Sequence, residues 1–219
     1  MTTTEPRTAD GPLGADYFER VYAASDDPWG FQSRWYEERK YQLALASLPR
    51  RRYRSGFEVG CSIGVLTALL GDRCDDLLAA DVSPRALQIA ATRVGPSVRL
   101  ERRELPRDWP EGTFDLVVLS EVGYYQDPDG LRELVRRSVA SLEQGGTLLA
   151  VHWRHPVEDY PLTGDQVHDV LRAACGVHPV AEHVEADFRL DVLLRADGEV
   201  DPGRLSVAAS TGVPGGYRA

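Results

Sequence analysis

The chain of 219 residues has few cysteines, a single lysine and no long apolar run. Its three cysteines, Cys61, Cys74 and Cys175, are odd in number and spaced unlike zinc ligands or a disulfide framework, which favours a reducing cytoplasm. The first ten residues are polar and contain no apolar core of a signal peptide. Because no segment has the length of a membrane span, we expect no association with a membrane.

Basic residues are fewer than acidic residues in this chain. Lysine and arginine number 25 against 34 aspartates and glutamates, which gives a net charge of −9. Nucleic-acid-binding surfaces are usually basic, so this balance argues against a nucleic-acid substrate. The basic cluster RRRYR at 50–54 follows the end of an expected helix, where cations favour the helix dipole, and we interpret it structurally. The sequence has no pair of acidic residues with an asparagine that would indicate a divalent-metal site, so we expect no metal.

Apolar runs alternate with helical patterns along the chain, as in repeated βαβ units. The run 114–119 is apolar apart from Asp115, as expected of a parallel strand buried on both faces. Ser83 followed by Pro84 is a strong helix start. The glycine- and proline-rich segment 197–219 is expected to be a loose tail. Strands are expected at 56–59, 77–80, 98–101, 114–119, 147–152, 180–186 and 190–195, and helices at 14–24, 35–48, 65–70, 83–94, 129–142 and 162–174.

The most informative segment is 57–66, which reads FEVGCSIGVL. An apolar strand leads into a turn that carries Gly60 and Gly64, and the turn opens a helical pattern. The next apolar run, 77–80, ends at Asp81. In a βαβ unit, such glycines let the backbone approach a nucleoside, and an acid after the next strand holds the ribose hydroxyls. These residues predict a nucleoside-containing cofactor.

A dinucleotide site is the main alternative. Its fingerprint, G-x-G-x-x-G, needs a middle glycine where the backbone approaches the pyrophosphate, and Ser62 occupies that place here. Glu58 would repel a pyrophosphate at close range, but it suits a ligand with an ammonium and a sulfonium. A tight turn without any ligand is a further alternative, and Asp81 in register argues against it. These features disfavour NAD and are compatible with S-adenosylmethionine (SAM), which carries no phosphate.

The segment resembles motif I of the class I SAM-dependent methyltransferases. Two more segments, DDPW at 26–29 and SEVGYY at 120–125, are similar to the nodulation protein S family, which methylates the free amine of a deacetylated chitooligosaccharide. The resemblance covers residues 17–153. It implies an α/β, Rossmann-like class I methyltransferase fold: a mostly parallel seven-stranded sheet with an antiparallel last strand, flanked by helices. Residues 1–55 would form extra N-terminal helices of the domain, and 56–196 its SAM-binding part.

The same resemblance implies a cofactor site, position by position. Residues of the glycine turn line the methionine and ribose side: Glu58, Gly60, Ser62 and Gly64. Asp81 offers two acceptors to the ribose diol, and Val82 covers one face of the adenine. Glu104 and Leu105 stand where the family has an acid–apolar pair for the adenine amino group, although the family usually has aspartate there. Ser120 ends the fourth strand near the methionine amino group.

Four residues of the N-terminal segment have two interpretations each. Trp29 and Tyr36 either lie over the cofactor as part of a lid that excludes water or join the extra helices to the sheet. Lys40 and Arg39 either pair with the methionine carboxylate or face solvent.

Candidates for the acceptor side follow the fourth and fifth strands, at the ligand edge of an open α/β sheet. They are Glu121, Tyr124, Tyr125, His152 and His155. His152 is the best base by its ordinary pKa, Glu121 suits an ammonium, and the tyrosine rings suit a cation. Each also has a structural interpretation, because tyrosines after a buried strand are often core and a histidine there can simply bond a backbone group. We take Glu121, His152 and Tyr124 as the catalytic candidates.

Together these features predict a SAM-dependent methyltransferase that acts on an amine of a small molecule, such as an amino sugar. Methylation of a hydroxyl, with His152 as the base, is one alternative. A module that binds SAM without turnover is another. The expected partner is a small-molecule acceptor, and the sequence leaves open whether the protein is a monomer or a dimer.

Overall fold

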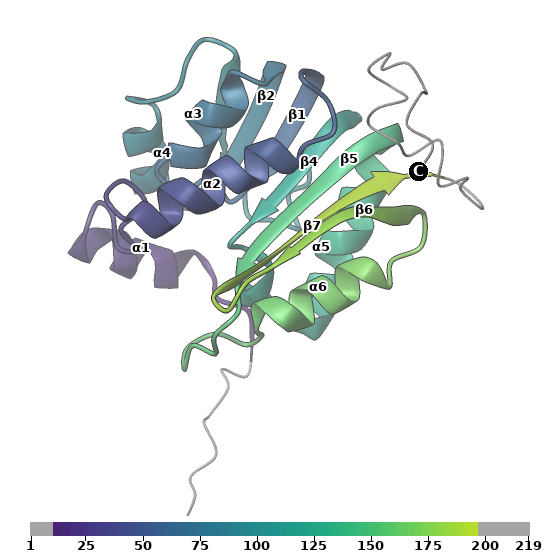
Figure 1. The fold of residues 1–219 in the computed structure, drawn as a ribbon. Helices are drawn as coiled ribbons and strands as arrows, with labels where there is room; N and C mark the ends of the chain where they lie inside the picture. Colours follow the sequence, from purple (N-terminus) through teal and green to yellow (C-terminus); the bar gives the residue numbers. More distant parts are fainter. Residues whose placement is uncertain (1–10, 197–219) are drawn as a thin grey trace, which may run out of the picture.

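The computed structural model describes residues 11–196, and the expected tail at 197–219 lies outside the described residues. Seven strands form one sheet in the order β3-β2-β1-β4-β5-β7-β6 (Figure 1). Neighbours from β3 to β5 are parallel, and β7 is antiparallel to both β5 and β6. The strands are β1 (Tyr53–Val59), β2 (Cys74–Asp81), β3 (Val98–Arg102), β4 (Phe114–Ser120), β5 (Leu142–Trp153), β6 (Val177–Val184) and β7 (Phe188–Arg195). The predicted mostly parallel α/β sheet with an antiparallel last strand is confirmed.

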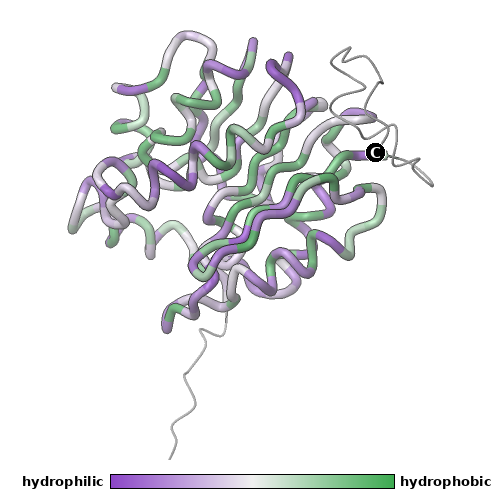
Figure 2. Tube along the Cα trace, in the orientation of Figure 1, coloured by the Kyte–Doolittle hydropathy of each residue, from purple (hydrophilic) through white to green (hydrophobic). Residues whose placement is uncertain are grey.

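Helices cover both faces of this sheet. They are α1 (Ala15–Ala24), α2 (Trp35–Ser47), α3 (Val65–Gly71), α4 (Pro84–Ala90), α5 (Pro128–Ser141) and α6 (Gly164–Arg172), with a 3₁₀ turn, η1 (Gly123–Tyr125). Residues of α2 and α3 pack with one set of strand side chains, and residues of α5 and α6 pack with the alternate set. Figure 2 shows hydrophobic residues concentrated along the central strands. Two apolar cores therefore hold the sheet between two layers of helices.

Helix starts follow the local sequence. The Ser83 side chain accepts a hydrogen bond from the Ala86 amide, and Pro84 is the first residue of α4, as predicted. The predicted helix at 83–94 is shorter in the structure, because α4 ends at Ala90 and the chain continues in i→i+3 turns. The division into 1–55 and 56–196 stays a prediction.

The largest difference concerns the strand expected at 147–152, which begins earlier, at Leu142, in the structure. Gly145 and Gly146 therefore lie inside β5. The pairing with β4 shifts register between Phe114 and Leu116, and Gly145 has a φ of +73°, so the strand accommodates an irregularity there. Pairing passes from Leu142, opposite Phe114, directly to Thr147, opposite Leu116, so the glycines keep a turn-like irregularity inside the strand.

The register brings three strand ends together. Val59 of β1 lies beside Ala80 of β2 on one side and Leu119 of β4 on the other. The residues that follow these strands consequently meet at one edge of the sheet, which is where open α/β sheets bind ligands.

Candidate cofactor site

A cavity of about 550 Å³ opens at this edge, within the range of small-molecule sites. Loops after β1, β2, β3 and β4 form its wall, and residues at the start of α1 close it from the other side. Ten of the predicted site residues line it: Trp29, Glu58, Gly60, Ser62, Asp81, Val82, Glu104, Leu105, Ser120 and Glu121. Five do not: Tyr36, Lys40, Gly64, Tyr124 and His152.

The two glycines of the turn have different structural reasons. A Cβ on Gly60 would lie 2.2 Å from the Val122 side chain, so glycine lets the turn approach the loop after β4. A Cβ on Gly64 would lie 3.0 Å from the Ala90 backbone, so that glycine lets α3 begin against α4. Both have positive φ, +72° and +78°, which glycine adopts without steric cost. Gly60 therefore shapes the cavity, and Gly64 packs the helices behind it.

Ser62 is held from two sides. Its φ of +50° is uncommon for a residue with a Cβ, and its amide donates to Asp81 Oδ2 over 2.8 Å. Its hydroxyl lies 2.6 Å from the hydroxyl of Tyr22, a buried residue of α1. Tyr22 also lines the cavity. The sequence analysis missed Tyr22, because its partner stands 40 residues away and no local pattern links them.

Asp81 retains capacity for a ligand. Oδ2 accepts the Ser62 amide, and Oδ1 accepts the Ser83 amide over 2.9 Å. Each carboxylate oxygen has a second lone pair, and the group lies on the cavity wall. Burial raises the pKa of Asp81, while the backbone amides act against that rise. This geometry fits a pair of ribose hydroxyls.

Glu58 provides an unsatisfied acceptor in the same cavity. Its side chain is 2% exposed, and Oε2 has no hydrogen-bond partner among the residues that the structure describes. Burial raises the pKa of this carboxyl to about 7. A buried, unpaired carboxylate is costly, and a cationic ligand would relieve that cost. The residues present therefore fit a cofactor that carries an ammonium and a sulfonium.

This pKa predicts pH-dependent SAM binding. Below about pH 7 the Glu58 carboxyl is protonated and must lose its proton to face a cation. SAM affinity should therefore fall by up to roughly tenfold per pH unit below that point and level off above it. Calorimetry between pH 5.5 and 8.5 measures this, and Glu58→Gln should flatten the profile. An equal slope in wild type and Glu58→Gln would assign the titration to another group.

Rising pH has the opposite effect on the stability of the ligand-free protein. A carboxyl whose pKa is raised by folding stabilises the protein below its unfolded pKa, and this contribution is lost as the pH rises through about 7. The ligand-free Glu58→Gln protein should consequently be more stable than wild type at pH 8.5, and thermal unfolding measures that difference.

Glu121 belongs to a buried charged network beside the cavity. Its Oε1 accepts from Lys40 Nζ, and its Oε2 accepts from the Tyr124 hydroxyl and from the Trp153 amide. Lys40 Nζ also lies 2.8 Å from Glu37 Oε2. Burial lowers the pKa of Lys40, but the two carboxylates outweigh burial and leave it raised. Glu121 itself has a φ of +56°, so its neighbours hold it in an uncommon conformation.

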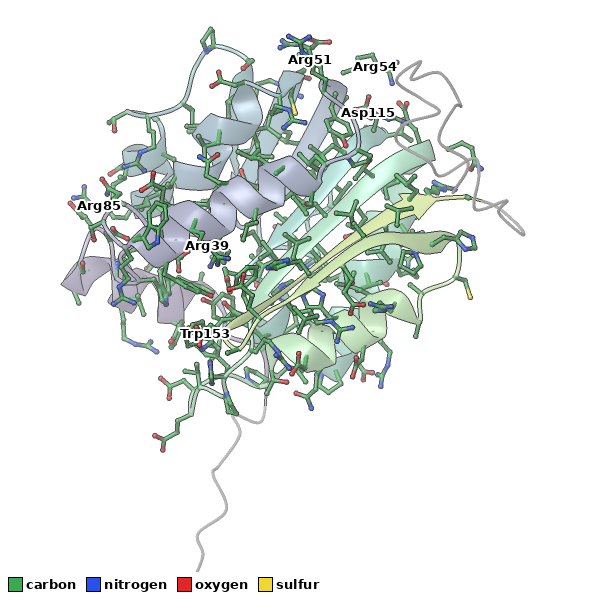
Figure 3. The ribbon with its side chains drawn as sticks, in the orientation of Figure 1. Arg39, Arg51, Arg54, Arg85, Asp115 and Trp153 are labelled. Atoms are coloured by element: carbon green, nitrogen blue, oxygen red, sulfur yellow. The ribbon has the colours of Figure 1, made fainter. Side chains whose placement is uncertain are left out.

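Lys40 therefore differs from both interpretations offered by the sequence. Its side chain is 1% exposed, so it does not face solvent, and it does not line the cavity. Arg39 pairs with Glu185, with Nη2 and Oε1 2.7 Å apart. Figure 3 shows Arg39 on α2 and Trp153 near the hairpin of β6 and β7. Neither cation is free to bind a methionine carboxylate in this arrangement.

Of the aromatic candidates, some line the cavity and others pack behind it. Trp29 lines the cavity and stacks on Phe31, with centroids 5.5 Å apart. Tyr36 instead packs edge-on against Trp153 and Phe188, which favours its role in joining α2 to the sheet. Tyr124 stacks on a neighbouring tyrosine ring and gives its hydroxyl to Glu121.

Tyr125, the second member of the tyrosine pair, lies on the cavity wall. Its ring meets Phe18 of α1 edge-on at 5.0 Å, and its carbonyl accepts the Leu13 amide over 2.8 Å. Leu13 and Phe18 also line the cavity. The tyrosine turn and α1 therefore close the cavity together, a contact that spacing in the sequence gave no means to find.

His152 is not placed to act as a base. It is fully buried away from the cavity, and its Nε2 accepts the Gly123 amide over 3.1 Å. Burial lowers its pKa well below the usual range. The structure thus favours the second interpretation of His152, a group that bonds the backbone. His155 is exposed and lies 2.8 Å from Asp187 Oδ1.

Two negative findings concern residues 11–196. No group of three or more histidine, cysteine, aspartate or glutamate side chains is arranged to hold a metal ion. No helix in that part of the chain has the length and apolar character needed to cross a membrane.

The sheet order, the glycine turn after β1 and the acid after β2 are features of the class I SAM-dependent methyltransferases. A more specific match is to the family model "Nodulation protein S (NodS)", which covers residues 14–158. This is more than half of the chain, and the protein belongs to the nodulation protein S family. The predicted resemblance is confirmed.

Individual relatives agree with this assignment. Nodulation protein S of Bradyrhizobium diazoefficiens is 31% identical over 130 residues, which are 58% of this chain and 62% of that protein. Nodulation protein S of Rhizobium tropici is 31% identical over 130 residues, 58% of this chain and 55% of the relative. The chain thus matches less than two thirds of the length of these curated relatives.

Solved structures match over more of the chain. A Pseudomonas syringae protein assigned as a methyltransferase is 43% identical, with a TM-score of 0.66 over 74% of this chain and 100% of that chain. The N-methyltransferase NodS from Bradyrhizobium japonicum WM9, in complex with S-adenosyl-L-homocysteine (SAH), is 24% identical. Its TM-score is 0.75 over 84% of this chain and 98% of that chain, which shows the shared fold.

Proposed function

We propose that this protein transfers a methyl group from SAM to the amine of a small molecule, such as an amino sugar. The acidic wall of the cavity is the observation that carries the proposal. Three arginines line it, Arg103, Arg107 and Arg137, and each is in an ion pair with a nearby acid. Seven carboxylates line it: Glu58, Asp81, Glu104, Glu121, Asp127, Asp129 and Glu133.

Three of these acids carry the excess of negative charge. Glu58, Asp81 and Asp127 have no cationic partner within the described part of the chain. A cleft lined by one sign of charge concentrates ligands of the other sign. Both an amine acceptor and SAM are cations, whereas a phenolate acceptor would be repelled. The wall therefore favours amines over phenols.

SAM supplies a methyl carbon already activated by its sulfonium. The amine nitrogen forms a bond to that carbon while the carbon–sulfur bond breaks, so the acceptor must first lose its proton. No histidine lines the cavity among residues 11–196, and both Glu121 oxygens already accept hydrogen bonds. The other wall carboxylates and water are left as proton acceptors, and both take a proton from an alkylammonium far more readily than from an alcohol. The protein contributes positioning and exclusion of bulk water.

The relatives support the same acceptor class. The Bradyrhizobium japonicum structure is named as an N-methyltransferase, and membership of its family extends nitrogen methylation to this chain as a proposal. The family's chitooligosaccharide acceptor makes deacetylated amino sugars the first compounds to try.

An acceptor panel tests this function. Transfer of labelled methyl groups should occur to amino sugars or small aliphatic amines, and not to phenols or alcohols. The rate should rise with pH as the amine deprotonates, and Glu121→Gln should raise the acceptor KM if this acid orients an ammonium. Methylation confined to hydroxyl compounds would contradict the proposal. So would SAM binding with no transfer to any acceptor.

A further inference from the structure

A chain of three buried side chains lies beside the site, and the function proposed above assigns no role to it. His152 Nδ1 is 3.1 Å from His168 Nε2, and His168 Nδ1 is 2.7 Å from Asp191 Oδ2. The three residues come from β5, α6 and β7, and each is 0% exposed. None of them lines the cavity. Burying a polar group costs free energy unless it is hydrogen-bonded, so we examine which atom donates and which accepts in each of these contacts.

The hydrogen bonds fix the protons of both rings. The Gly123 amide can only donate, so His152 Nε2 is the acceptor and carries no proton. A neutral His152 then has its proton on Nδ1 and donates to His168 Nε2. His168 in turn carries its proton on Nδ1 and donates to Asp191. The lowered pKa of buried His152 agrees with the neutral ring.

Asp191 anchors the far end of the chain. Its Oδ1 accepts from Arg172 Nη1 over 3.1 Å, and Arg189 Nε lies 3.5 Å from Oδ2. Two guanidiniums therefore lie against this carboxylate, and a carboxylate is an acceptor only. The direction of every bond from Asp191 back to Gly123 follows from this anchor.

The near end of the chain holds the η1 turn. Gly123 lies so close to α6 that a Cβ on it would be 2.5 Å from the Val167 side chain and 3.2 Å from His152 Nε2. The residue before it, Val122, packs against Gly60 of the glycine turn. Tyr125, two residues later, lies on the cavity wall. A shift of this turn would therefore move Val122 and Tyr125, which both line the cavity.

We propose that His152, His168 and Asp191 are positioning residues, which fix the Gly123 amide and thereby hold Val122 and Tyr125 in place for cofactor binding. The chain acts as an oriented series of hydrogen bonds from the Asp191 carboxylate to one backbone amide. Its role does not depend on which acceptor is methylated.

The first test is spectroscopic and uses the unmodified protein. Nitrogen-15 NMR at neutral pH should show both His152 and His168 as neutral rings with the proton on Nδ1. The Gly123 amide should exchange slowly with solvent. A charged ring, a proton on Nε2 of either histidine, or rapid exchange at Gly123 would overturn the proposal, whatever the protein methylates.

The second test separates positioning from general stability. His152→Phe keeps a ring but removes the acceptor for Gly123. Thr147→Val is the matched control, because Thr147 lies on the same strand, β5, and is equally buried. Its hydroxyl accepts a hydrogen bond of 3.1 Å from the Tyr53 hydroxyl, and neither residue lines the cavity. Calorimetry should show SAH binding roughly tenfold weaker in His152→Phe and within about twofold of wild type in Thr147→Val.

A conservative variant completes the design. His152→Gln offers an amide oxygen near the position of Nε2, so it should restore Gly123 protection and most of the SAH affinity. Asp191→Asn replaces the acceptor-only anchor by a group that can also donate, and it should disturb the proton positions on both rings. Should His152→Phe fail to fold, the comparison of Asp191→Asn with wild type decides. Unchanged rings and unchanged SAH affinity in Asp191→Asn would overturn the proposal.

Discussion

Replacing Lys40 by methionine is expected to lower the free energy of unfolding by about 3–5 kcal/mol, because it leaves two buried carboxylates without their common cation. Lys40 Nζ contacts both Glu37 and Glu121, and its side chain is almost fully buried. Methionine fills a similar volume, so the loss reports the charge and not a cavity. Denaturant unfolding at neutral pH measures the effect.

The loss should depend on pH. Burial already raises the pKa of Glu37, and Lys40 opposes that rise. Loss of the cation removes this opposition, so the penalty for the charged carboxylate grows as the pH rises. The Lys40→Met difference should therefore be smaller at pH 5 than at pH 8. The double variant with Glu121→Gln should recover part of the stability, since it removes one orphaned charge.

Arg39→Met is the matched control on the same helix. Arg39 also pairs with a glutamate, but its side chain is 41% exposed, and exposed pairs contribute little to stability. Equal effects of the two substitutions would contradict the view that Lys40 belongs to a buried network.

Replacing Asp81 by alanine is expected to weaken SAM and SAH binding ten- to hundred-fold, a cost of about 1.5–3 kcal/mol. The variant removes both acceptors for the ribose diol. It also leaves the Ser62 amide without the partner that holds its left-handed conformation. Calorimetry on the folded variant measures the loss.

Asp76→Ala is the control for that experiment. Asp76 lies on the same strand, but its carboxylate is half exposed and pairs with Arg99 far from the cavity. Its replacement should leave cofactor affinity within about threefold of wild type. Unchanged affinity in Asp81→Ala would mean that the acid after β2 does not hold the ribose.

Features that depend on neighbouring residues were predictable from the amino-acid sequence. The turn at 57–66 and Asp81 follow from the few residues at the ends of two strands, and both lie at the cavity. The start of α4 follows from Ser83 and Pro84. These inferences hold because glycine conformations, helix caps and buried strands depend mainly on neighbouring residues.

The pairing of the polar residues, in contrast, follows from the folded arrangement and not from the order of residues. The partner of Lys40 stands 81 residues away, and the partner of Tyr22 stands 40 residues away. His152 reads as a base from its ordinary pKa, yet burial and the Gly123 amide make it a neutral acceptor. The charge and proton positions of a side chain depend on what surrounds it in space. Spacing along the chain therefore located the site, while packing decided which of its residues face the cavity and which support it from behind.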